Sequence, residues 1–487
     1  MSETAAFPLP FAADDTVSVM PIRTLRELAM MDMSALIRAK PEWHVKMNDA
    51  GIVAKWTQEA AEQGMTEAQI RYVLTELAYY AALRDETTGI EVSGVDGVWQ
   101  SDRLIDEELR SRLRAAVRVL EDVPEEKRDW HPGSEGQVLD LVHPSLFCLV
   151  RGVSLPEGAA WSSLNKDSAE YAFSDKFQWL PTDVEVGENG EVVFHSYVNN
   201  LHPDDHRELE SVLPILFERM RPLFENVLTD LRHPRKPRID ADPYTWHVEE
   251  EDQDSDDAEE DEYWWREPSA LAPDAPDFTM PPPPSDADRV DLRGRRLQVI
   301  VKLATVHLTP DKPEYAGGSW HVEGMMNERI VSTGIYYWDS ENITESRLSF
   351  RAAVEEPHAE HNDFEGMRDV YGLEQWQNLN QVLGSAETRA GRALAFPNIL
   401  QHRVDPFGLA DPTRPGHRKI LAFFLVDPSV RITSTADVPP QQPWSPTSTM
   451  TLKQAEEYRK ELMQERKFFV GKHTEDVYER EFSLCEH

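Results

Sequence analysis

The second half of the chain consists of short apolar runs separated by turn residues, and this pattern restricts the fold most. The runs are rich in β-branched and aromatic residues, which favour strands. They cover residues 297–310, 329–339, 346–354, 391–398 and 418–428. Gly, Pro, Asn and Asp separate them, without the intervening helical segments of a βαβ fold. The sequence therefore predicts a sandwich or a jelly roll over residues 289–440.

Helical patterns precede this region, so the chain as a whole is expected to be α+β. Apolar residues recur at three- and four-residue spacing from Pro21 to about Leu120, as in amphipathic helices. A charged amphipathic helix is also expected from Thr451 to Lys467. The predicted divisions are a helical N-terminal region at 21–135, a first part of the catalytic region at 136–247, and a helical tail at 441–487.

One further helix is expected after Pro203, within the first part of the catalytic region. Asp204 or Asp205 is a suitable residue to cap its start. Pro214 and Pro222 lie inside its apolar pattern. Because proline lacks a backbone N–H, the sequence predicts one or two kinks or breaks in this helix.

An acidic block followed by a proline run separates these helices from the jelly roll. The acidic residues are concentrated between Glu249 and Glu262, and four consecutive prolines begin at Pro281. Both compositions disfavour a packed core, so residues 248–288 are predicted to form a disordered insert. An alternative interpretation is an interaction segment centred on the aromatic run 263–265.

The charge of the chain excludes some classes of partner. Its 88 acidic and 50 basic side chains give a formal net charge of −38, which repels nucleic-acid phosphates and anionic membrane surfaces. Cys148 and Cys485 are too few and too far apart for a disulfide framework. No signal peptide or membrane-spanning run is evident, so a cytoplasmic location is expected. Oligomeric state is not indicated.

The chemistry-bearing residues lie in the strand-rich half. His321 and Glu323, in GGSWHVEG, are two positions apart, so on an extended backbone both side chains point to the same side. His402 lies at the end of a later strand-like run. Two histidines and one carboxylate, with open positions, are typical of non-haem Fe(II) oxygenases. We therefore predict that His321, Glu323 and His402 are the catalytic metal ligands.

Arg418 follows His402 at the start of the apolar run KILAFFLVDP. A guanidinium inside an apolar barrel can hold a carboxylate in a bidentate pair, as the distal carboxylate of 2-oxoglutarate requires. Lys302, Asn327 and Tyr337 lie on or beside predicted strands and are secondary candidates for cosubstrate binding.

Longer motifs carry a resemblance to a known family. HPSLFCLVRG, FQWLPTDVEV, SYVNNLHP, GGSWHVEG and the segment from FPNILQH to FFLVDP resemble a large, mainly fungal and bacterial family known only as a domain of unknown function. The resemblance extends from about Thr24 to Ser429. The order H-x-E, distant His, then Arg is similar to that of the double-stranded β-helix 2-oxoglutarate oxygenases, in which Asp is the commoner carboxylate.

The resemblance implies an Fe(II)- and 2-oxoglutarate-dependent dioxygenase that uses O2 and releases succinate and CO2. Because Glu323 supplies a carboxylate, no ligand position is vacant for halide, and hydroxylation, desaturation or oxidative cleavage is expected rather than halogenation. The primary substrate, a small molecule or a peptidyl group, is not identified by any motif. Two alternatives stay open: a cupin-type hydrolase or isomerase using zinc or manganese, and a catalytically silent interaction scaffold.

Overall fold

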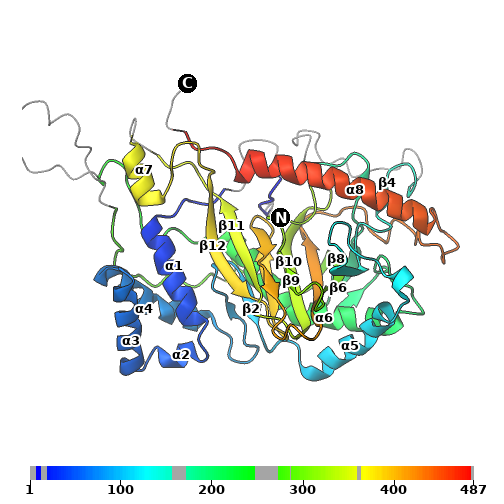
Figure 1. The fold of residues 1–487 in the computed structure, drawn as a ribbon, viewed down its shortest axis with the longest axis horizontal. Helices are drawn as coiled ribbons and strands as arrows, with labels where there is room; N and C mark the ends of the chain where they lie inside the picture. The colour runs from blue at the N-terminus through cyan, green and yellow to red at the C-terminus, as the bar shows by residue number, and fades with distance from the viewer. Residues whose placement is uncertain are drawn as a thin grey trace, which may run out of the picture.

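A computed structural model describes residues 7–11, 19–155, 172–246, 272–285, 287–358 and 363–483. The protein is α+β, with a large antiparallel sheet, a smaller one and surrounding helices. Figure 1 shows the strands in the middle, helices α1 to α4 clustered at one end and the long helix α8 running along one side. Among the described residues, no helix is long and apolar enough to cross a membrane.

The large sheet has nine strands in the order β1-β2-β13-β10-β16-β8-β6-β7, with β3 also paired to β8. Its central strands confirm the runs expected at 297–310, 329–339, 391–398 and 418–428. The strands are β1 (Glu91–Val92), β2 (Trp99–Ser101), β3 (Val138–Val142), β6 (Thr182–Val186), β7 (Val192–Phe194), β8 (Arg295–Leu308), β10 (Ile330–Glu341), β13 (Ala393–Pro397) and β16 (Gly416–Val426).

The smaller sheet has the order β12-β11-β14 and lies against the inner face of the large one. It comprises β11 (Arg347–Ala353), β12 (Asn380–Glu387) and β14 (Gln401–Val404). Phe350 and Leu383 of this sheet share one buried cluster with Tyr337 and Phe424 of the large sheet. The two sheets therefore enclose a common interior. Two short pairs complete the strands: β9 (Glu314–Tyr315) with β15 (Phe407–Gly408), and β4 (Leu149–Val150) with β5 (Phe177–Gln178).

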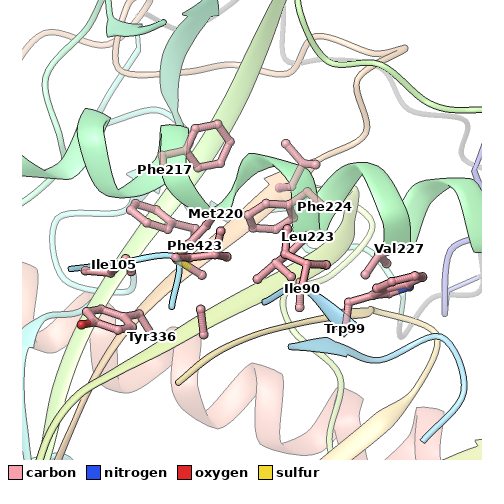
Figure 2. Packing of buried hydrophobic residues seen from close by; sticks show 14 of the residues in the cluster. Ile90, Trp99, Ile105, Phe217, Met220, Leu223, Phe224, Val227, Tyr336 and Phe423 are labelled. Atoms are coloured by element: carbon pink, nitrogen blue, oxygen red, sulfur yellow. The ribbon is translucent and has the colours of Figure 1, made fainter. Parts of the chain in front are cut away.

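Helix α6 (Arg207–Arg232) covers the outer face of the large sheet. Phe217 and Phe224 of this helix pack against Phe423 of β16 within one apolar cluster, which Figure 2 shows from close by. The approach is close enough to require a glycine in β10, since a Cβ atom at Gly334 would lie 2.4 Å from the Phe224 ring. The position of α6 thus fixes the outer side of the strands that carry the candidate site.

Two details of α6 differ from the sequence-based prediction. The helix continues through Pro214 and Pro222 without a break, and its N-cap is His206 rather than Asp204 or Asp205. Each internal proline costs roughly 3 kcal/mol of helix stability. Eleven buried residues along α6 offset that cost, because their burial needs one continuous helix.

The remaining helices surround the sheets. They are α1 (Leu25–Arg38), α2 (Trp43–Lys46), α3 (Ala50–Glu62), α4 (Glu67–Leu83), α5 (Glu107–Glu121), α7 (Phe364–Tyr371) and α8 (Leu452–His473). Thr451 caps α8 with a capping box, which is a typical helix start. Helix α8 confirms the helix expected from Thr451 to Lys467. Most of the acidic insert lies outside the described residues, and 272–285 form no helix or strand. The division into regions stays a prediction.

A buried ionic network joins the N-terminal helices to the segment that follows α6. The Arg238 side chain, 2% exposed, donates to Glu76 at 2.9 Å and to Asp96 at 2.9 Å. Its backbone N–H donates to Glu27 at 2.8 Å. Because Glu27 and Glu76 belong to α1 and α4, one guanidinium neutralises carboxylates from separate elements.

We expect Arg238→Met to destabilise the protein by about 3–5 kcal/mol, because it removes the buried cation that Glu27, Glu76 and Asp96 share and leaves them only Arg23 and Arg235. Urea unfolding followed by circular dichroism measures the change. The control is Arg431→Met, whose side chain is 57% exposed and pairs with Asp437 at 3.1 Å; its effect should stay below about 1 kcal/mol. Equal losses in the two variants would contradict a structural role for the network.

Candidate metal centre

Two backbone hydrogen bonds bring the two candidate histidines together. The His402 N–H donates to the His321 carbonyl at 2.9 Å, and the His321 N–H donates to the His402 carbonyl at 3.2 Å. His402 belongs to β14, and its backbone pairs on the other side with Phe350 of β11. The His321 segment therefore adds to the outer edge of the small sheet. The two imidazole centroids are 4.3 Å apart.

Glu323 completes the cluster. Its Oε1 atom lies 3.8 Å from His321 Nε2 and 3.6 Å from His402 Nε2. One ligand atom from each residue lies within 4.8 Å of the others, so a single cation could contact all three. The glutamate side chain, which is one methylene longer than that of aspartate, thus reaches both imidazoles. The structure brings together the residues that the H-x-E spacing and the distant histidine predicted.

The hydrogen bond of the His321 ring suits metal ligation, whereas Nδ1 of His402 has no hydrogen-bond partner among the described residues. His321 Nδ1 lies 2.8 Å from the Ser319 carbonyl, so Nδ1 carries the proton and the Nε2 lone pair faces Glu323. Desolvation in this recess lowers the pKa of His321 to about 4. Burial alone would raise the pKa of Glu323, but the neighbouring imidazoles lower it to about 2. The cluster therefore offers a neutral imidazole and an ionised carboxylate at neutral pH.

Exposure differs between the two histidine side chains, which are 37% exposed for His321 and 4% for His402. His402 packs against Phe396, with ring centroids 4.7 Å apart. One side of the cluster is thus enclosed by apolar rings and the other is open. An open side is what a catalytic metal centre needs to admit a cosubstrate.

Asn398 holds the backbone of Glu323 in place, and the sequence-based prediction missed it. The Glu323 N–H donates to Asn398 Oδ1 at 2.8 Å, and Asn398 Nδ2 donates to the carbonyls of Glu323 at 2.9 Å and Ile330 at 3.0 Å. Asn398 is buried. Its place in FPNILQH, shortly before His402, is the only sign of this role in the sequence.

The loop after Glu323 is held by a second buried residue, Glu328. It accepts the N–H groups of Met325 and Trp179, each at 2.7 Å, and the Arg466 guanidinium of α8 at 2.6 Å. The loop after Glu323 is therefore attached both to Trp179, the residue after β5, and to helix α8. Rigid support of this kind keeps ligand atoms at fixed positions.

Arg418 lies in the interior between the sheets, on β16. It is 3% exposed, and its guanidinium lies over the Tyr337 ring, 4.7 Å from the centroid. The structure records no ion pair between Arg418 and any carboxylate of the described residues, and its Nε atom has no hydrogen-bond partner there. Burial lowers the pKa of Arg418. A buried guanidinium of this kind is able to bind an anionic ligand.

The other candidates for cosubstrate binding differ in their surroundings. Lys302, on β8, is partly exposed and acts electrostatically on His321 and Glu323. Tyr337 is buried beneath the Arg418 guanidinium. Asn327 is engaged elsewhere, since its side-chain amide accepts from the Ser174 N–H and donates to the Ser174 carbonyl, both at 2.8 Å. The Asn327 side chain is thus occupied by Ser174, whereas Tyr337 contacts Arg418.

Comparison with known proteins identifies a family but no activity. A family model described as "Protein of unknown function (DUF4246)" matches residues 67–447, and the N-terminal model of the same family matches residues 1–59. No curated protein matches the chain.

Solved structures resemble the chain only distantly. The Fe(II)/α-ketoglutarate-dependent dioxygenase TqaL matches at 10% identity and a TM-score of 0.28, covering 65% of this chain and 75% of its own. The rice dioxygenase for auxin oxidation matches at 13% identity and a TM-score of 0.25, covering 73% and 78%. IDO from Bacillus thuringiensis matches at 10% identity and a TM-score of 0.19 over 28% of this chain, which spans about half (48%) of that structure.

We expect His402→Ala to lose bound metal while the protein stays folded, because the substitution removes one of three ligands from a centre that backbone bonds assemble. Metal analysis after anaerobic Fe(II) loading and desalting measures the loss, and circular dichroism checks the fold. His358→Ala, at an exposed position, is the matched control and should retain the metal. Full iron stoichiometry in folded His402→Ala would contradict the assignment.

Proposed function

This chain belongs to the DUF4246 family, and we propose that it is an Fe(II)- and 2-oxoglutarate-dependent oxygenase. The observation that carries the proposal is the combination of a two-histidine, one-carboxylate cluster with a buried arginine on an inner strand that forms no ion pair with any carboxylate of the described residues. The cluster suits iron chemistry. The arginine suits a dicarboxylate cosubstrate.

The strand order supports a double-stranded β-helix as the scaffold. One sheet contains the run β13-β10-β16-β8, and the facing sheet contains β12-β11-β14. The His321 backbone pairs with His402 at the edge of β14, which adds a fourth segment to the smaller sheet. Two facing four-membered sheets are the expected arrangement of a jelly roll, and the cluster then lies between the edge segment and β14.

His321, Glu323 and His402 would hold the iron, with the open side of His321 left for cosubstrate. Bound Fe(II) supplies redox chemistry with O2, coupling conversion of 2-oxoglutarate to succinate and CO2 with oxidation of a substrate. The protein's own contribution is to orient the ligands and to exclude water from the interior. The apolar ring of Phe396 against His402 serves the second purpose.

Arg418 would pair with the distal carboxylate of 2-oxoglutarate. An isolated buried charge is unfavourable, and a carboxylate accepting two N–H bonds from a guanidinium relieves that cost. The Tyr337 ring packs against the Arg418 guanidinium, 4.7 Å from its centroid. A hydrolase or isomerase using the same three ligands would leave this arginine without a ligand, and therefore accounts for fewer of the observed features.

We expect Arg418→Ala to weaken 2-oxoglutarate binding by roughly two to four orders of magnitude while Fe(II) binding stays nearly normal. The estimate follows from about 3–5 kcal/mol for breaking a buried charge pair, at about 1.4 kcal/mol per decade. Anaerobic titration of the iron-loaded protein, followed by the visible metal-to-ligand charge-transfer band, measures the affinity. Arg418→Lys should be intermediate, because an ammonium keeps the charge and loses the fork.

The matched control is Arg296→Ala, since Arg296 lies on β8 with its side chain 86% exposed. This variant should bind 2-oxoglutarate like the parent. If Arg418→Ala also binds like the parent, another cation holds the distal carboxylate, and Lys302 is the next residue to test. If the iron-loaded parent itself gives no band, the proposed function is wrong.

A further inference from the structure

A second polar cluster lies in and around β3 of the large sheet. His131, Asp140 and His143 each offer a ligand atom within 4.8 Å of the others. His131 Nδ1 lies 2.8 Å from Asp140 Oδ2. The Asp140 side chain is only 1% exposed, and its Oδ1 atom has no hydrogen-bond partner among the described residues. A buried carboxylate oxygen without a donor is costly unless a ligand supplies one.

The strand register places Asp140 on the same side of the sheet as Arg418. Asp140 pairs with Ala304 of β8, and Arg418 pairs with Val306 of the same strand. Directly paired residues share a face, and residues two apart on a strand also share one. Lys302, Ala304 and Val306 therefore point inward together, and Asp140 joins them. The second cluster faces the interior that holds the candidate metal centre.

Strand pairing links Lys302 to both clusters. Lys302 is two positions before Ala304, the partner of Asp140. It pairs with Ala422, which belongs to the same buried cluster as Phe396, the residue that packs against His402. The structure records no ion pair between Lys302 and a carboxylate of the described residues, and the residue is partly exposed although it points inward. A cation and a carboxylate thus lie on one inner surface, near the metal ligands and not paired with each other.

Lys302 is set apart from the arginine assigned to the cosubstrate. Arg418 pairs with Val306 of β8, and Val306 lies four positions after Lys302 on the same strand. This corresponds to roughly 13 Å along the strand at about 3.3 Å per residue. With the distal carboxylate of 2-oxoglutarate at Arg418, Lys302 is free to bind an anionic group of another molecule.

The hydrogen bonds of His143 argue against a second metal centre. The Ser145 N–H donates to His143 Nδ1 at 3.2 Å, so the neutral ring carries its proton on Nε2. His321 has the opposite arrangement, with Nδ1 facing a carbonyl. His143 therefore lacks a free lone pair for a cation, and the nearby Lys302 charge opposes one further. The cluster is better suited to hold an ionised Asp140 in place.

We propose that Lys302 and Asp140 form the primary-substrate subsite of this oxygenase, and that the substrate is a free α-amino acid. Its carboxylate pairs with the Lys302 ammonium, and its ammonium group donates to Asp140 Oδ1, while His131 fixes Asp140 through Oδ2. The inference rests on the proposed function, because it places this subsite beside the iron. It adds the substrate class that the metal ligands leave open.

Opposite charges at one subsite select for a zwitterion. A simple amine satisfies only Asp140, and a simple acid satisfies only Lys302. In either case one buried or half-buried charge remains unpaired, and sites built for a polar group reject analogues lacking it strongly. 2-Oxoglutarate carries no ammonium group, so it does not compete well for this subsite.

The test uses the full protein loaded anaerobically with Fe(II) and 2-oxoglutarate. Each of the twenty standard L-amino acids is added, and the charge-transfer band is recorded. We expect at least one amino acid to shift the band, because a substrate beside the iron changes its coordination. The N-acetyl derivative of that amino acid, and the amine lacking its carboxylate, should bind at least 100-fold more weakly.

Two variants test the assigned residues. Asp140→Asn should lose the amino-acid-induced shift and keep the band produced by 2-oxoglutarate. Lys302→Met should also lose the amino-acid-induced shift. Asp311→Asn, at an exposed position, is the control and should behave like the parent. Thermal unfolding identifies any loss of fold in Asp140→Asn. If that variant does not fold, Lys302→Met still tests the subsite, because Lys302 is partly exposed.

The outcomes separate this inference from the proposed function. A parent protein that forms the band but responds to none of the twenty amino acids overturns the inference alone. Loss of the 2-oxoglutarate band in folded Lys302→Met also overturns it, because Lys302 would then hold the cosubstrate. A second metal equivalent that disappears in His143→Ala overturns it in favour of a cation site. Absence of the band in the parent overturns the proposed function.

Discussion

The reciprocal backbone hydrogen bonds between His321 and His402 are the constraint on which the candidate site depends. They join the segment after β9 to the edge of β14, and they bring the imidazoles of two distant segments to 4.3 Å between centroids, with the rings tilted by 47°. Glu323 then needs only to follow His321 by two residues to reach both rings. Asn398 fixes the Glu323 backbone by two hydrogen bonds and ties it to the Ile330 carbonyl by a third. The geometry of the cluster is therefore a property of the sheet edge.

Charge in the interior is the second organising feature. Arg418 and Lys302 both point between the sheets, and neither pairs with a carboxylate of the described residues. The buried network around Arg238 is different, because there each charge meets an opposite one. The contrast separates structural charges from those available to ligands. Arg418 and Lys302 are therefore the cations that we assign to ligand binding, rather than the more numerous cations on the surface.

The sequence predicted the strands, and the proximity of His321, Glu323 and His402, for a physical reason; their role as metal ligands stays a prediction. Inward-facing apolar residues mark the strands, and the H-x-E spacing places two ligands on one side of the backbone. It predicted α6 less well, since Pro214 and Pro222 indicate breaks that packing against the sheet overrides. No pattern in the sequence pointed to Asp140, because the residues around it come together only when β3 pairs with the distant strand β8.

The most direct test of the central claim is anaerobic addition of 2-oxoglutarate to the Fe(II)-loaded protein, followed in the visible spectrum. We expect a saturable charge-transfer band, which zinc-loaded protein should not give. Admission of O2 should then convert 2-oxoglutarate to succinate. Protein that retains iron at His321, Glu323 and His402 but gives neither the band nor O2-dependent succinate would contradict the account.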